Sequence, residues 1–232
     1  MSYLWQEFNI KTFPSETLVF RDGVFCENLS DYENINFDSE NNIISIIKTP
    51  KLPVHIIYIG EISGKNDMNI NINSENTGVF MTVKTNNKIP AFLNFFIKNT
   101  GKNSIFNGQI ITQNYDSLKM DIKADHLCEN TGIFVKTRVL AHKNSNTLLN
   151  ASGIIEKNVK KCDSDLSFSV MADENAKITM CPKQYIKSEP KNASHSASLY
   201  TYNESQIEYL RGAGLSSTEI KNILEEAFLT EI

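Results

Sequence analysis

The side chains of this chain best suited to metal or redox chemistry are its cysteines and histidines. The four cysteines are far apart in the sequence, at Cys26, Cys128, Cys162 and Cys181. No Cys-x-x-Cys pair occurs, which excludes a zinc knuckle formed by one short segment. A thiolate site assembled across the fold, or across a subunit interface, stays open. Cys162 follows Lys160 and Lys161, whose charges would favour its thiolate form.

A structural role is the alternative for each of these side chains. Cysteine is often buried as a small apolar residue, and a lone histidine such as His195 indicates little by itself. Cys181, before Pro182, is a further candidate ligand. His126 and Cys128 alternate on one expected strand and are weaker candidates.

Motifs of common enzyme classes do not occur. The sequence contains no GxSxG, no GxxxxGK[ST] and no GxGxxG, the segments that position a nucleophilic serine, a nucleotide phosphate and a dinucleotide. Asp163, Asp165 and Asp173 are the carboxylates that a carbohydrate-active β-helix enzyme could use. That activity, and a purely structural β-solenoid, are kept as alternatives to a non-catalytic binding protein.

Composition and charge limit the classes of partner and the cellular location that we expect. The chain has 232 residues and a formal net charge of -4, with no basic patch, so we expect no nucleic-acid partner. Residues 1–13 lack a basic start followed by an apolar run, so we expect no signal peptide. No run reaches the ~18 apolar residues of a membrane-spanning helix. We therefore expect a cytoplasmic protein with reduced cysteines and no membrane span.

Most of the chain has the pattern of β-strands. Short runs rich in Ile, Val, Phe and Thr recur from Thr17 to about Ile186. Residues 69–73 and 166–170 alternate strictly between apolar and polar, which indicates strands with one buried face. Residues 54–59 are apolar throughout and suit a strand covered on both faces. The sequence therefore predicts a mainly β protein.

One repeated turn bears on the architecture. Residues 75–80, Glu-Asn-Thr-Gly-Val-Phe, recur as Glu-Asn-Thr-Gly-Ile-Phe at 129–134, and a shorter Asn-Thr-Gly lies between them at 99–101. Similar turns at such separations suggest the stacked rungs of a solenoid, in which asparagines could form ladders. A β-sandwich is the alternative, although two-residue hairpin signals are scarce.

The last part of the chain changes to a helical pattern. Asn203 can cap a first helix, which Gly212 and Gly214 would end. Ser216 and Glu219 form a capping box for a second helix. That helix carries an apolar stripe at Ile220, Ile223, Leu224, Ala227 and Phe228. We expect a β core over 1–200 and a helical segment over 201–232, whose stripe packs either on the core or on another protein.

Together these segments resemble the SufB/SufD family, the scaffold proteins of SUF iron–sulfur cluster assembly. The matching segments are Ser194-His195-Ser196-Ala197, Gln206-Ile207-Glu208-Tyr209-Leu210, Arg211-Gly212-Ala213-Gly214-Leu215-Ser216 and Ala227-Phe228. Cys162-Asp163-Ser164 is similar to the C-D-S segment of SufB. Thr137-Arg138-Val139 with Gly153 is similar to an arginine-bearing strand and a small-residue turn of the family.

The resemblance implies a right-handed parallel β-helix with a short C-terminal helical pair. It implies a non-catalytic scaffold that pairs with a second SufB/SufD-type chain, the same or different, at the end of the β-helix. There a cysteine and a histidine meet, and the candidates are Cys162 and His195 as ligands of a transient iron–sulfur cluster. Iron in such a cluster favours thiolate, with imidazole completing its shell.

The helical segment is implied to bind the ABC-type ATPase SufC. The residues we expect at that surface are Tyr209, Leu210, Leu215, Ile220, Ile223, Leu224, Ala227 and Phe228. Three features depart from the family pattern. The long N-terminal helical region of larger members is absent, the Arg-Gly turn carries one or two extra residues, and Ser196 stands where SufB has glutamate. A compact member that pairs with itself fits these departures.

Overall fold

The computed structural model of the protein describes residues 17–22, 24–28, 35–50 and 53–230. The first strands are β1 (Thr17–Arg21), β2 (Val24–Asn28), β3 (Ile35–Asp38), β4 (Ile43–Ile46), β5 (Val54–Glu61), β6 (Gly64–Ile72), β7 (Gly78–Asn87) and β8 (Ala91–Asn99). Then follow β9 (Ile105–Asn114), β10 (Ser117–His126), β11 (Gly132–Ala141), β12 (Asn146–Ile155), β13 (Asp163–Ala172), β14 (Lys177–Ile186) and β15 (Asn192–Tyr200). The helices are α1 (Glu204–Gly212) and α2 (Ser217–Thr230).

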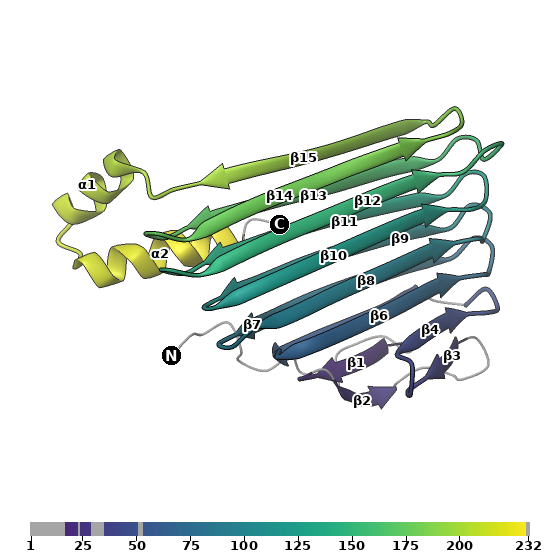
Figure 1. Ribbon diagram of the computed structural model, residues 1–232, viewed down its shortest axis with the longest axis horizontal. Helices are drawn as coiled ribbons and strands as arrows, with labels where there is room; N and C mark the ends of the chain where they lie inside the picture. The colour runs from purple at the N-terminus through teal and green to yellow at the C-terminus, as the bar shows by residue number, and fades with distance from the viewer. Residues whose placement is uncertain (1–16, 23, 29–34, 51–52, 231–232) are drawn as a thin grey trace.

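The strands form two facing sheets that the chain visits in turn (Figure 1). The eight-stranded sheet has the order β15-β13-β11-β9-β7-β5-β1-β2, and the seven-stranded sheet has the order β14-β12-β10-β8-β6-β4-β3. From β5 onward each strand pairs in parallel with the strand two places along the chain. This is a parallel β-solenoid, so the predicted fold class is confirmed and the sandwich alternative is wrong.

Repeated asparagine turns set the length of the rungs. Asn76, Asn103 and Asn130 lie one above another at 27-residue spacing, with Asn103 Nδ2 donating to Asn76 Oδ1 (3.1 Å) and Asn130 Nδ2 donating to Asn103 Oδ1 (3.2 Å). All three have positive φ, a backbone conformation that asparagine tolerates better than most residues. The two predicted turn repeats are thus two rungs apart. The equivalent of Asn76 in the middle rung is Asn103, not the predicted Asn99.

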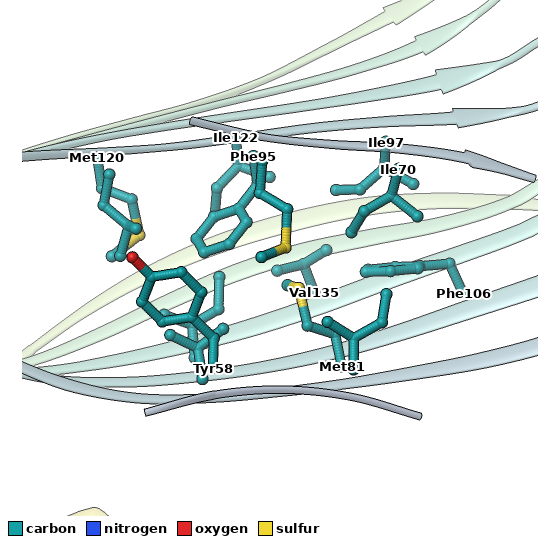
Figure 2. Close-up of a cluster of buried hydrophobic side chains, with 14 of the residues drawn as sticks. Tyr58, Ile70, Met81, Phe95, Ile97, Phe106, Met120, Ile122 and Val135 are labelled. Atoms are coloured by element: carbon teal, nitrogen blue, oxygen red, sulfur yellow. The ribbon is translucent and has the colours of Figure 1, made fainter. Parts of the chain in front are cut away.

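The space between the sheets is filled by apolar side chains, some of which Figure 2 shows. Phe95, Phe106, Ile70 and Val135 are among the fully or nearly fully buried members. They occupy alternate positions of their strands, because successive side chains of a strand point to opposite faces. Neighbouring strands keep this alternation in register, so one continuous core extends along the solenoid axis.

The two ends of the solenoid differ. At the N-terminal end β1–β2 and β3–β4 are antiparallel pairs, and Phe25 and Phe37 pack 4.6 Å apart, each within 5.5 Å of the Phe20 ring. At the C-terminal end the terminal strands β14 and β15 pair in parallel with β12 and β13. Within the described part of the chain β2, β3, β14 and β15 each have one strand neighbour. We call the exposed edges and inner faces of β14 and β15 the open end.

Helix α2 packs on the outer face of the eight-stranded sheet. Phe228 and Leu229 form a buried cluster with Ile111, Leu140 and Met171, which point outward from β9, β11 and β13. Helix α1 has no buried residue and lies beside α2, beyond the end of β15 (Figure 1). The apolar stripe of α2 is therefore used in part within its own chain.

Candidate functional site

Cys162 belongs to a column of side chains at one corner of the solenoid. The strand register aligns Thr77, Ser104, Thr131 and Cys162, each just before its strand in the eight-stranded sheet. All four are buried, and Cys162 has no exposed surface. The Ser104 Oγ accepts a hydrogen bond from Thr77 N (3.0 Å), and the Thr131 Oγ1 lies 3.3 Å from Cys162 Sγ. Cys162 therefore stands where three earlier rungs carry a hydroxyl.

The thiol of Cys162 is enclosed by backbone. Its Sγ lies 3.4 Å from the Cys128 carbonyl oxygen and 3.7 Å from that of Lys160, both acceptors. Lys191, before β15, donates its backbone N–H to the Cys162 carbonyl oxygen (2.7 Å). Lys160 and Lys161 are exposed, and Lys160 reaches the sulfur through its carbonyl oxygen. The geometry suits a thiol that donates to carbonyl groups.

His126 is a buried neighbour of this thiol. Its Nδ1 lies 2.8 Å from Thr131 Oγ1, so Thr131 joins the imidazole and the sulfur. Its Nε2 has no hydrogen-bond partner among the described residues. Burial lowers the pKa of His126 to about 4, against the opposing charge of Asp163. The imidazole is therefore neutral near pH 7. Alternation along β10 places His126 in its inward-facing set with Ala124 and Ile122. β10 ends at His126, so Cys128 lies in the turn that follows and not on the strand expected to carry both.

His195 lies at the open end. It is aligned with Leu166 of β13 and so shares the inward-facing set of its sheet. Because no described strand lies beyond β15, its side chain is exposed. Its imidazole makes no hydrogen bond or ion pair with the described residues. The imidazole is therefore free to meet a group of a partner chain.

Cys162 precedes β13 and His195 lies on the adjacent strand β15, but the two side chains do not meet within this chain. The register aligns His195 with Leu166, four residues after Cys162. Four residues of strand span roughly 13 Å, and the thiol is buried whereas the imidazole is exposed. Within the described ranges no group of three or more His, Cys, Asp or Glu side chains could hold a metal.

The other sequence candidates have separate surroundings. Cys128 and Cys181 are half-buried free thiols, and the side chain of Cys26 lies outside the described residues. His55 stacks on Phe80 with ring centres 5.4 Å apart, and His142 stacks on Tyr115 at 3.8 Å. Burial, helped by the Lys221 charge, lowers the pKa of His142 to about 4.

The three aspartates of the carbohydrate-enzyme alternative do not form one cluster. Asp163 begins β13 and Asp173 follows its last residue, so the length of the strand, roughly 30 Å, separates them. Asp165 accepts a hydrogen bond from Ser194 (2.9 Å), and Asp173 pairs with Lys221. Asp163 and Asp165 lie two residues apart on β13, so the three carboxylates do not converge on one site.

The residues predicted to bind SufC divide between two environments. Ile220 and Phe228 are buried, and Leu210, Leu215 and Leu224 are half-buried. Tyr209 is 78% exposed and Ile223 is 42% exposed, and Ala227 is also exposed. The predicted capping box is confirmed, since Ser216 N donates to Glu219 Oε2 (2.8 Å) and Glu219 N donates to Ser216 Oγ (3.3 Å).

A polar network holds α2 against the turn after β13. Lys221 forms an ion pair with Asp173 and lies 3.7 Å from Glu225, which accepts a hydrogen bond from the Tyr202 hydroxyl (2.7 Å). Burial opposes the charge of Asp173, but the hydrogen bond from Lys221 holds the pKa of that carboxyl below its ordinary value. Burial and the Glu225 carboxylate raise the pKa of Tyr202. The network adds polar contacts to the apolar cluster that holds α2 on the solenoid.

A parallel solenoid with an open end and a C-terminal helix pair is the architecture expected from the resemblance. The family profile described as "SUF system FeS cluster assembly, SufBD core domain" matches residues 66–228, more than half of the chain. The chain belongs to the SufB/SufD family, and its role lies in SUF iron–sulfur cluster assembly. No curated protein gives a significant match to the chain. Of the described helices, none has the length and apolarity that crossing a membrane requires.

Proposed function

We propose that this protein is a non-catalytic scaffold subunit of the SUF system. It pairs through the open end with a second SufB/SufD-type chain and binds a SufC-type ABC ATPase through its helix pair. The observation that carries the proposal is the difference between the two ends of the solenoid. At one end the terminal strands β2 and β3 are held by antiparallel pairing. At the other, the terminal strands β14 and β15 continue the parallel coil and carry exposed apolar side chains and His195.

The open end has the properties of a protein interface. β14 and β15 each expose one edge, and an exposed edge strand is a template for pairing with another chain. Ile186 and Leu199, on the inner faces of these strands, are 46% and 56% exposed. Apolar side chains next to unpaired edges favour a partner that covers both.

The cluster is cargo that this interface would hold transiently. His195 supplies an accessible imidazole, and thiolates from the partner chain would supply the softer ligands that iron–sulfur clusters favour. Cys162 is the thiol of this chain proposed for the same site. Because it is buried one strand behind the edge, it would reach a cluster only if β15 moved away from β13.

The helix pair is the proposed SufC-binding surface. Tyr209 and Ile223 supply its exposed apolar side chains, and Leu210, Leu215, Leu224 and Ala227 lie around them. Ile220 and Phe228 act indirectly, because they fix α2 on the solenoid. Such assemblies, with thiols that must stay reduced, fit a cytoplasmic location.

Two sets of variants test the proposal, the first with a matched control. In co-purification with a SufC-type ATPase, Tyr209→Ser combined with Ile223→Ser should abolish capture, whereas Glu208→Ser combined with Asn222→Ser should retain it. For the open end, Leu199→Asp should abolish association with a second SufB/SufD-type chain measured by sedimentation. Capture and association that survive these changes would overturn the proposed surfaces.

Anaerobic reconstitution with iron and sulfide tests the cluster ligands. The two-chain complex should show cluster absorption that decreases in His195→Ala. Cys162→Ser should decrease it as well if the last rung opens during loading. Unchanged absorption in both variants would contradict their proposed role as ligands.

A further inference from the structure

Gln184 joins the two sheets at the last rung. It lies on β14, aligned with Gly153 of β12, and so belongs to the inward-facing set of the seven-stranded sheet. Its Nε2 donates to Ser164 Oγ on β13 (3.2 Å) and to the backbone carbonyl oxygen of Ser194 on β15 (3.1 Å). One side chain thus bridges β14 to both of the last strands of the opposite sheet.

The bridge depends on the absence of a side chain at Gly153. A Cβ atom there would lie 2.2 Å from Gln184 Oε1 and 2.9 Å from Gln184 Nε2. Because the Gln184 amide ends a flexible side chain, alanine at this position would displace the amide without moving the backbone. The displaced amide would lose both hydrogen bonds. The small residue at 153 is therefore coupled to Gln184.

Strand β15 is otherwise held by its ladder with β13, by hydrogen bonds from Asn192 to Asp163 and from Ser194 to Asp165, and by the contact of Tyr200 with Phe228. It has β13 as its one strand neighbour in the described part of the chain, and none of its side chains is fully buried. Ser194, whose carbonyl oxygen Gln184 binds, directly precedes His195. The bridge therefore acts on the peptide unit that determines where the His195 backbone lies relative to β14.

We propose that Gln184 is a positioning residue for His195, and that Gly153 is the residue that admits it. The inference rests on the proposed function of His195 at the open end. It extends that function, because the Gln184 bridge would keep β14 and β15 at a fixed spacing. A partner chain that pairs with both strands must match that spacing. A partner that adds strands to both edges requires β14 and β15 to be presented together.

Hydrogen exchange of the β15 amides, Asn192–Tyr200, tests the bridge in the full chain. Gln184→Met keeps the length of the side chain but cannot donate, and Gly153→Ala displaces the amide. Each should speed β15 exchange by roughly tenfold, the effect of losing one or two hydrogen bonds, while β11 exchange stays at the wild-type rate. The double variant should not exceed the larger single effect, because both changes remove the same bridge.

Lys183→Met is the matched control, since Lys183 is the exposed neighbour of Gln184 on the same strand. It should leave β15 exchange unchanged. Wild-type exchange of β15 in Gln184→Met, or additive effects in the double variant, would overturn the bridge.

Sedimentation with a second SufB/SufD-type chain separates this inference from the proposed function. Gln184→Met should weaken association together with its faster β15 exchange. Faster exchange with unchanged association would overturn the positioning role. His195→Ala should weaken association while β15 exchange stays as in the wild type, and unchanged association of that variant would instead contradict the proposed role of His195.

Discussion

The guanidinium of Arg138 on β11 donates a hydrogen bond to the Phe228 carbonyl oxygen of α2 and lies 5.5 Å from the centre of the Phe228 ring. A cation beside the last carbonyls of a helix is also favoured by the helix dipole. Arg138, which points outward from the solenoid, thus holds the C-terminal end of α2. The exposed face of the same helix is part of the surface that we propose binds SufC.

Replacement of Arg138 by methionine should loosen α2. The variant keeps an apolar stem over Phe228 but loses the charged donor, and hydrogen bonds to charged groups contribute about 1.5–3 kcal/mol. We expect faster hydrogen exchange of the α2 amides, while the core strands keep their protection. Lys136→Met, an exposed position two residues earlier on the same strand, is the control. Equal α2 protection in both variants would show that the contact does not hold the helix.

The attachment of α2 should also depend on pH through Asp173 and Lys221. The pKa of Asp173 is lowered in the folded chain from 3.8, so its contribution is present above that value and is lost as pH falls through the folded pKa. Burial opposes the charge of Lys221, but Asp173 raises the pKa of Lys221 above 10.5. Its contribution is therefore present below 10.5 and lost at higher pH, through the folded pKa.

Protection of the α2 amides should thus be greatest between about pH 4 and 10. Asp173→Asn should reduce it within that range and remove its dependence on acid. If α2 protection in Asp173→Asn fell with acid as in the wild type, a group other than Asp173 would be responsible for that fall.

Acid should destabilise the solenoid through His126. An unfolded histidine binds its proton near 6.5, whereas the folded pKa is about 4. Stability therefore falls as pH decreases from 6.5 towards 4, by up to about 3 kcal/mol for this residue. In urea unfolding, His126→Gln should lower stability at pH 7 and flatten the curve between these values. His142→Gln is the necessary comparison, because the pKa of His142 is also about 4. A curve that His126→Gln leaves unchanged would refute the assignment.

The cysteines should differ in their reaction with iodoacetamide. Cys128 and Cys181 are half-buried and Cys162 has no exposed surface. Under native conditions we expect mass spectrometry to show labelling of the first two, with Cys162 reacting at the rate at which the last rung opens. Cys162→Ser should be tolerated with less than about 1.5 kcal/mol of destabilisation, because serine fills the equivalent position at Ser104. Labelling of Cys162 as fast as Cys181 would contradict its enclosure.

Period-two alternation was sufficient to predict a mainly β protein, because it depends on local geometry. The alternation and the repeated Asn-Thr-Gly turn left a solenoid and a sandwich open, and the resemblance to the SufB/SufD family favoured the β-helix. The capping box at Ser216 and the stripe of α2 were visible because they too depend on local geometry. The packing of that stripe on the solenoid could not be predicted from the sequence. Ile111, Leu140 and Met171 are seen to form one patch only when the register of three strands is known. Burial of Cys162 likewise depends on the alignment of its turn with Thr131.

The bridge from Gln184 illustrates what pattern alone misses. Nothing about Gln184 in the sequence distinguishes it from a surface glutamine, and Gly153 reads as one more small residue near a turn. Their coupling requires two strands of one sheet and two of the other to be placed together. The resemblance to the SufB/SufD family named His195, but the side chain that positions it is visible only in three dimensions.

The unlike ends of the solenoid bear on how copies of such a chain would join. A rod with two adhesive tips could lengthen indefinitely, as amyloid-like stacks do. Two copies that join through their β14–β15 tips about a twofold axis would bury the same surface on both members. The tips left outside would be the antiparallel ends that carry Phe25 and Phe37, so a third copy would find no β14–β15 tip to join.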